Sequence, residues 1–331
     1  MIIVKTPLRI SFVGGGSDMK RFYERSNGKV VCTAIDKFVY AIVKERFDDM
    51  IYINYSKKEC VERVEDIDHD LVREAMKRTG VEKGIEITTL ADIPSSGSGL
   101  GSSSSITVAL LHALYTYRNT LVTAEQLARD ACRIEIDLLG KPIGRQDQYA
   151  AAFGGVNRFR FAAADRTERT PLKMTGGVRR RFAASLLLYY TGITRSANPI
   201  LQQQQANMAD QGRFEAVKQM VALVDPFVEA MREGDLKTCG RLMDENWRLK
   251  QQMADGISNP EISRMYEAAR QAGALAGKIA GAGGGGFLLL IVPRERQNDV
   301  FEAMRAYREL PFMIEDSGSK VIFDDRGYSS K

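Results

Sequence analysis

A segment rich in glycine and serine stands directly before an apolar helical pattern and is the strongest chemical signal in the chain. Residues 94–105 contain three glycines and seven serines. Glycines let backbone N–H groups approach phosphate oxygens, and the free N–H groups of a helix N-terminus favour an anion. The segment therefore predicts a phosphate-binding loop. A flexible linker is the alternative interpretation, but linkers rarely lead straight into an amphipathic helix.

The spacing within this segment excludes two common nucleotide loops. A Walker A loop needs a lysine after its last glycine, whereas Gly101 is followed by Ser102. A dinucleotide-binding fingerprint needs a third glycine at the position of Ser102. A nucleotide-dependent dehydrogenase is therefore disfavoured.

The segment from Pro94 to Ser104 resembles the second motif of the GHMP kinases, the superfamily of galactokinase, homoserine kinase, mevalonate kinase and phosphomevalonate kinase. That motif runs Pro, a few small residues, then Gly-Leu-Gly-Ser-Ser-Ala, and Ser104 replaces the alanine. Three other segments resemble further family motifs, in the family's order: Lys5–Asp18, Gly144–Gly155 and Lys278–Phe287. Because the four motifs cover the chain from residue 5 to residue 287, the chain is identified by resemblance as a member of this family.

The resemblance implies an ATP-dependent kinase that uses Mg²⁺, because phosphoryl transfer needs held phosphates, neutralised charge and an aligned acceptor hydroxyl. The segment around the second motif would hold the nucleotide through Pro94, Ser96, Gly97, Ser98, Gly99, Leu100, Gly101, Ser102, Ser103 and Ser104. A non-catalytic sugar sensor of the same fold would lose this loop or the catalytic carboxylate, and this chain keeps both.

Three charged residues carry the expected chemistry. Asp147 is expected to take the proton of the acceptor hydroxyl or to orient that hydroxyl. Arg9 is expected to keep Asp147 ionised and to neutralise transferred charge. Glu135 stands twelve residues before Asp147, as the metal-binding glutamate does in galactokinases. Ser102 or Ser103 is the second expected Mg²⁺ ligand, and the sequence does not decide which.

The first motif carries the clue to the acceptor. Where galactokinases have Glu-His in contact with the hexose, this chain has Gly15 and Gly16, followed by Ser17 and Asp18. The loss of two side chains predicts a pocket for a longer sugar, in which Asp18 still bonds ring hydroxyls.

The segments Lys5–Asp18 and Tyr190–Arg195 most resemble the D-glycero-D-manno-heptose 7-phosphate kinases. Those enzymes phosphorylate the anomeric hydroxyl to give the 1,7-bisphosphate, in nucleotide-activated heptose biosynthesis. An anomeric kinase of an unphosphorylated sugar of the fucose or galactose type is the alternative. Lys5, Arg195 and the arginines 179–181 are candidate anchors for a substrate phosphate.

Elements of mixed α/β type must position these residues. Strands are expected at 30–35, 39–44, 51–55, 85–90, 185–190 and 287–292, and helices at 102–118, 124–139, 213–232, 235–253 and 260–272. The family resemblance implies two α/β domains with the active site in the cleft between them: residues 1–178, which bind ATP, and residues 179–331. The glutamines 202–205 are expected on a solvated helix or loop.

The composition fits a globular enzyme. The 331 residues are 44% hydrophobic and 27% charged, and the net charge of +5 gives little support for a nucleic-acid partner. No apolar run approaches the length of a membrane span, and the first residues lack the pattern of a signal peptide. The four cysteines are widely spaced, which predicts reduced thiols in a cytoplasmic protein. A sugar phosphate and ATP are the expected partners, and a homodimer is left open.

Overall fold

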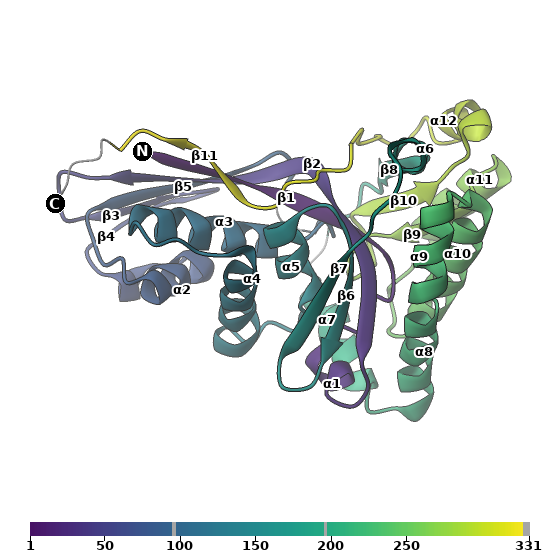
Figure 1. The fold of residues 1–331 in the computed structure, drawn as a ribbon, viewed down its shortest axis with the longest axis horizontal. Helices are drawn as coiled ribbons and strands as arrows, with labels where there is room; N and C mark the ends of the chain where they lie inside the picture. The colour runs from purple at the N-terminus through teal and green to yellow at the C-terminus, as the bar shows by residue number, and fades with distance from the viewer. Residues whose placement is uncertain (95–96, 195–196, 327–331) are drawn as a thin grey trace.

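The computed structural model describes residues 1–94, 97–194 and 197–326. Within these residues the fold consists of a large sheet backed by helices and a small sheet covered by a second set of helices (Figure 1). The mixed α/β class expected from the sequence is confirmed.

The large sheet has eight strands in the described residues. The main path runs β11-β1-β2-β5-β3-β4, and β6 joins the other end of β2 and pairs with β7. All pairs are antiparallel except β3 with β5. The strands are β1 (Ile2–Val13), β2 (Gly28–Glu45), β3 (Ile51–Asn54), β4 (Lys58–Val61), β5 (Ile85–Ala91), β6 (Val156–Ala162), β7 (Arg166–Pro171) and β11 (Lys320–Asp324).

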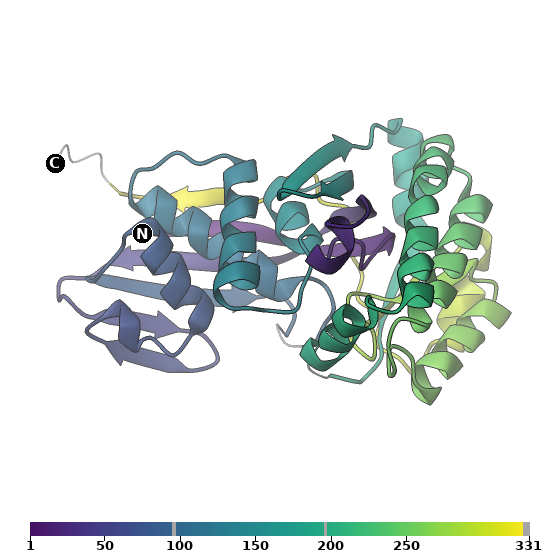
Figure 2. The same cartoon turned by 90° about the horizontal axis from the view of Figure 1, so that it is seen from below.

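Helices cover one face of this sheet, as the view from below shows (Figure 2). The longest, α3, buries Val108, Leu111 and Leu114 against β1 and β2. The helices of this half are α1 (Lys20–Tyr23), α2 (Asp70–Thr79), α3 (Ser102–Tyr117), α4 (Ala124–Cys132) and α5 (Gln146–Phe153), with a 3₁₀ turn η1 (Val64–Asp66) and a π-helical segment η2 (Arg133–Leu138).

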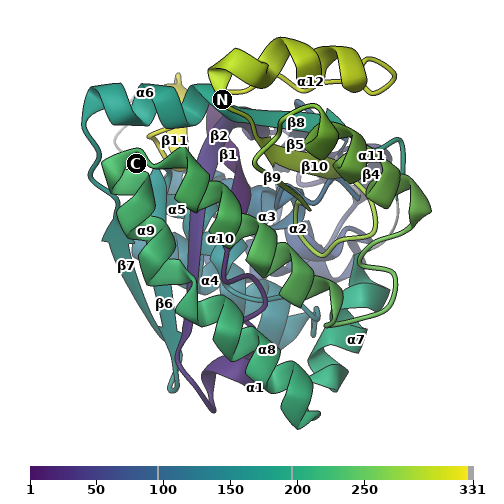
Figure 3. The ribbon, with the colours of Figure 1, turned by 90° about the vertical axis from the view of Figure 1, so that its right-hand side faces the viewer.

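The small sheet has the order β8-β10-β9, and β10 is buried along its whole length. Helices α10 and α11 pack on this sheet, and α10 also reaches β1 (Figure 3). The elements are β8 (Leu186–Tyr190), β9 (Ala276–Ile279), β10 (Phe287–Ile291), α6 (Gly176–Ala184), α7 (Asn198–Asn207), α8 (Gln211–Ala222), α9 (Val224–Glu233), α10 (Leu236–Gln251), α11 (Pro260–Gln271), η3 (Arg294–Arg296) and α12 (Gln297–Ala303).

Several of the expected elements differ in the structure. The helix expected over 124–139 is α4 followed by the π-helical segment η2. The single helix expected over 213–232 is two helices, α8 and α9, which meet at Leu223. Pro226 explains the break, because a proline lacks the N–H that would continue the helix and its ring clashes with the carbonyl four residues earlier. The strands expected at 30–35 and 39–44 are one long strand, β2.

The larger of two hydrophobic clusters spans both halves. Phe12 at the end of β1 packs against Phe182 of α6 at 5.5 Å and against Phe227 of α9 at 5.6 Å, both measured between ring centroids. The last described strand, β11, pairs with β1 of the large sheet. The end of the chain therefore belongs to the sheet of the first half. The expected boundary at residue 178 falls inside α6 and remains a prediction.

Candidate active site

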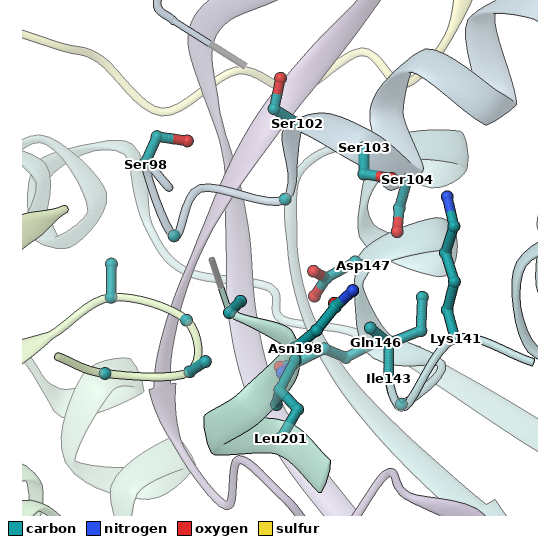
Figure 4. Close-up of a pocket in the computed structure, with 18 of the residues that line it drawn as sticks. Ser98, Ser102, Ser103, Ser104, Lys141, Ile143, Gln146, Asp147, Asn198 and Leu201 are labelled. Carbon is teal, nitrogen blue, oxygen red and sulfur yellow. The ribbon is translucent and has the colours of Figure 1, made fainter. Parts of the chain in front are cut away.

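A cleft of about 610 Å³ opens where the two halves meet. Its walls come from the segment before α3, the loop after β9, the loop after β1, the start of α5, and helices α7 and α10. In Figure 4, Asp147 lies between the serines that begin α3 and the side chains of Asn198 and Leu201 on α7. The motifs that lie far apart in the sequence therefore meet at this cleft.

The phosphate loop has the conformation that its glycines predict. Gly97, Gly99 and Gly101 have φ angles of 76°, 73° and 79°, and α3 begins at the next residue, Ser102. The N–H groups of the first helical turn are free for an anion at this point. The loop is anchored beneath by a hydrogen bond of 3.0 Å from the Arg9 amide to the Leu100 carbonyl.

A second glycine-rich loop, residues 280–286, packs against the phosphate loop. A Cβ atom at Gly99 would lie 2.4 Å from the Ala280 carbonyl oxygen, and one at Gly286 would lie 2.4 Å from the Ser98 carbonyl oxygen. No side chain fits at such distances, so glycine is required for the two loops to approach. The third family motif thus supports the second through backbone contact.

Arg9 and Asp147 form a bidentate ion pair at the centre of the cleft. The Arg9 Nε and Nη2 groups donate to the two Asp147 carboxylate oxygens at 2.7 and 2.5 Å. The Arg9 Nη1 group donates to the Gly99 carbonyl at 2.6 Å. The guanidinium therefore connects the carboxylate to the phosphate loop, and such paired geometry fixes the orientation of both groups.

Glu135 is fully buried and lines the cleft beside the start of α3. Its carboxylate accepts hydrogen bonds from Ser103 Oγ at 2.8 Å and from Gln148 Nε2 at 2.7 Å. Burial raises its pKa, and nearby Lys141 opposes that shift. The Oγ atom of Ser102 is buried and has no hydrogen-bond partner in the described part of the chain. The Glu135 carboxylate and the unpartnered Ser102 hydroxyl line the same cleft, and both are oxygen ligands of the kind that Mg²⁺ prefers.

The loop after β1 is held from behind by α10. The Gly14 amide donates to Asn246 Oδ1 at 2.9 Å. Ser17 Oγ is buried and donates to the Gly14 and Lys29 carbonyls. Asp18 faces the cleft and accepts hydrogen bonds from the Gly16 and Gln146 amides. Burial is the largest cause of its raised pKa, and the charge of Asp147 adds to it.

Most of the predicted site residues line the cleft together. These are Arg9, Gly16, Asp18, Gly97, Ser98, Gly99, Gly101, Ser102, Ser103, Ser104, Glu135 and Asp147. Gly15 and Ser17 lie buried behind the wall, Leu100 is in the core, and Pro94 lines a smaller neighbouring cavity. Ser96 lies outside the described residues.

The expected phosphate anchors lie elsewhere. The Lys5 ammonium stacks over the Phe38 ring at 3.7 Å, and Arg179 pairs with Asp316. None of Lys5, Arg179, Arg180 and Arg181 lines the cleft, and Arg195 is outside the described residues. The cleft's remaining described lysines are Lys141 and Lys250.

Several cleft residues were not predicted from the sequence. They are Met19, Lys141, Ile143, Gly144, Gln146, Thr194, Ala197, Asn198, Leu201, Gln204 and Lys250, together with five residues of the loop 280–286. Gln204 belongs to the glutamine run expected to be solvated, yet it is buried and donates to the Ala282 carbonyl at 3.1 Å. A signal was available for Lys250, because it follows Asn246 by one helical turn on an otherwise buried face.

Comparisons with known proteins agree with this geometry. Residues 64–155 match the GHMP kinases N-terminal domain, and residues 227–309 match the GHMP kinases C-terminal family. The chain is 30% identical to the D-glycero-alpha-D-manno-heptose 7-phosphate kinase of Campylobacter jejuni, over 92% of this chain and 93% of the relative. It is 27% identical to the Arabidopsis thaliana bifunctional fucokinase/GDP-fucose pyrophosphorylase, over 74% of this chain and 24% of that protein.

A solved structure of a heptose phosphate kinase has a similar fold. The crystal structure of a D-glycero-D-manno-heptose 1-phosphate kinase from Bacteroides thetaiotaomicron matches with a TM-score of 0.81 and 27% identity. The match covers 98% of this chain and 99% of that chain. No helix in the described residues is both long and apolar enough to cross a membrane.

Proposed function

The chain belongs to the GHMP kinase family, and from this premise we propose that it transfers the γ-phosphoryl group of ATP to the anomeric hydroxyl of D-glycero-D-manno-heptose 7-phosphate. The product would be the 1,7-bisphosphate, an intermediate on the way to nucleotide-activated heptose. The observation that carries the proposal is the Arg9–Asp147 pair, which is joined to Gly99 of the phosphate loop and faces a cleft between the two halves. The similarity to heptose phosphate kinases supports the choice of acceptor.

The nucleotide is held by backbone and hydroxyl groups in this mechanism. The N–H groups at the start of α3 and the serines 102–104 would bind the β- and γ-phosphates. Mg²⁺ would be held by Glu135 with Ser102 or Ser103 and would neutralise phosphate charge. The buried Glu135 carboxylate and the unpartnered Ser102 hydroxyl support this assignment.

Asp147 acts on the acceptor. Its carboxylate takes the proton of the anomeric hydroxyl, or orients that hydroxyl, as the oxygen forms its bond to the γ-phosphorus. Arg9 holds the carboxylate in place through two hydrogen bonds. Asp18 and the backbone at Gly16 contact the sugar, and Asn198 and Leu201 of α7 border the same space.

A substrate panel tests the proposal. ADP release is measured with ATP and Mg²⁺ for heptose 7-phosphate, mannose, fucose and galactose, and ³¹P NMR identifies the position of the new phosphate. We expect the highest kcat/KM for heptose 7-phosphate and an anomeric phosphate in the product. Preferred turnover of fucose or galactose would replace this acceptor with the alternative, an unphosphorylated sugar.

A further inference from the structure

Lys250 is a buried lysine that faces the cleft. It lies on α10, and only 5% of the residue is exposed. Its ammonium group donates to the Gly281 carbonyl at 2.7 Å. An ammonium carries three N–H donors, and in the described part of the chain no second hydrogen bond to this group is formed. Donors of Lys250 therefore remain for a ligand in the cleft.

A second buried lysine provides the contrast. Lys278 on β9 is 1% exposed, and its ammonium donates to the Ser11 and Phe12 carbonyls at 2.8 and 3.1 Å. It does not line the cleft. Lys278 thus binds backbone carbonyls at the end of strand β1, whereas Lys250 lines the cleft.

Lys250 lies where the proposed nucleotide-binding end of the cleft meets the proposed acceptor-binding end. Its partner Gly281 packs so closely on the phosphate loop that a Cβ atom there would lie 2.7 Å from the Gly99 carbonyl oxygen. Arg9 donates to that same oxygen at 2.6 Å. The two cations are therefore anchored to loops that touch each other, next to Asp147.

We propose that Lys250 is a catalytic residue whose ammonium group donates hydrogen bonds to the phosphoryl group in transit. The inference rests on the proposed phosphoryl transfer. In that step the acceptor oxygen forms a bond to the γ-phosphorus and its proton passes to Asp147. The bond from the γ-phosphorus to the bridging oxygen breaks, and the electron pair leaves with ADP. Lys250 keeps its proton and stabilises charge on the non-bridging oxygens.

The burial of Lys250 and the charged groups around it predict how kcat depends on pH. Four charged residues face Lys250: Asp18 from the loop after β1, Arg9 from β1, Asp147 from α5 and Lys278 from β9. Burial lowers the pKa of Lys250 to about 8, and the two aspartates oppose that shift. Since the ammonium loses its proton as pH rises through this value, kcat falls on the alkaline side.

The same shift has a consequence for stability. Above pH 8 and up to the usual lysine value of 10.5, the unfolded chain holds a proton that the folded chain has lost. Stability therefore rises with pH in that window, and at neutral pH the buried charge is a cost to the fold.

Lys250→Met and Lys250→Arg test the proposal, with Lys218→Met as the matched control, because the Lys218 side chain on α8 is exposed. For Lys250→Met we expect kcat to fall by about a hundredfold, little change in KM for either substrate, and an unchanged or higher Tm. Lys250→Arg should recover part of the rate and lose the alkaline decline, because arginine stays charged. Lys218→Met should match the wild type.

A binding measurement keeps this test independent of the acceptor. ADP with Mg²⁺ and aluminium fluoride mimics the phosphoryl group in transit. Lys250→Met should therefore lower the affinity for this mixture by about tenfold or more, while the affinity for ADP alone stays normal. Equal losses for both, a lower Tm with unchanged kcat, or an effect only on the acceptor KM would overturn the proposal. A wild type that ignores heptose 7-phosphate would instead refute the acceptor assignment.

Discussion

The two ends of the cleft are built in different ways. The proposed nucleotide end consists of consecutive backbone, residues 97–104, against a second glycine loop, and its close contacts are between main-chain atoms. The acceptor end consists of side chains from the loop after β1, from α7 and from α10. A site made of consecutive backbone leaves a local signature in the sequence, whereas a site made of distant side chains does not.

The ends also differ in electrostatics. Asp18 at the acceptor end has a pKa raised by burial, and Lys250, where this end meets the nucleotide end, has a pKa lowered by burial to about 8. The loop 97–104 has no charged side chain and offers neutral donors instead. Buried charges cost free energy when their ligand is absent. The acceptor end is therefore where we expect substitutions to separate activity from stability.

Asp147→Asn tests the point where the ends meet and has the largest expected effect. The change keeps the size of the side chain and an oxygen that can accept from Arg9, but it removes the charge. Turnover should drop by about 10²-fold or more, while ADP affinity measured by calorimetry stays near that of the wild type. Near-normal turnover would show that the carboxylate is not needed at this position.

Gly101→Val tests the backbone construction of the nucleotide end. Gly101 has a φ of +79°, and a Cβ atom there would lie 3.1 Å from Arg9 Cγ. A branched side chain should strain the loop and displace Arg9, and ATP affinity should fall by about tenfold or more, which is about 1.4 kcal/mol. Far-UV circular dichroism should remain similar.

Gly80→Val is the matched control for this variant. Gly80 at the end of α2 has a φ of +69°, and a Cβ atom there would meet nothing within 4 Å. It should lower stability by about 1 kcal/mol through backbone strain and leave ATP affinity unchanged. If both variants bind ATP like the wild type, the loop does not touch the nucleotide.

Glu135→Gln tests the metal assignment with a smaller effect. Loss of the charge should raise the Mg²⁺ concentration for half-maximal rate by about tenfold. Since burial raises the pKa of Glu135 above its usual value of 4.5, the folded chain binds this proton more tightly, and stability falls as pH rises through that window. Without Mg²⁺ the variant should therefore melt at the same temperature or higher at pH 7. An unchanged Mg²⁺ requirement would contradict the role.

The local patterns that could be predicted are those in which neighbouring residues determine the structure. The helix after Gly101 and the buried strand at 287–291 lie close to their expected positions, because a glycine loop and an apolar run each act locally. Strand β1 was not predicted, since its residues mix charges, a proline and apolar side chains. Its strand conformation is stabilised by pairing with β2 and β11, and its own residue pattern does not indicate this pairing.

The site followed the same rule. Arg9 and Asp147 were found because motif order places them, and the structure brings their side chains within hydrogen-bond distance. The sequence does not predict the roles of Lys250 and Gln204, because helical spacing can place a polar residue on a buried face but cannot say which loop that face meets. Gln204 is also one of four consecutive glutamines, and nothing in the run distinguishes it. Their roles come from which loop each helix faces, and tertiary packing decides that.

Gly15→Glu tests the acceptor end and carries the smallest expected effect. Gly15 has no positive φ, and a Cβ atom there would lie 3.8 Å from Lys250 Nζ, so a side chain can be accommodated. A glutamate at this position would place a carboxylate beside Lys250 and lower the rate for every acceptor. It would also repel an acceptor that carries its own phosphate. The ratio of kcat/KM for heptose 7-phosphate to that for mannose should therefore fall by about tenfold, and Gly15→Ala should leave the ratio unchanged. If the ratio is constant while both rates fall, the carboxylate acts only through Lys250, and the substrate phosphate lies beyond its reach.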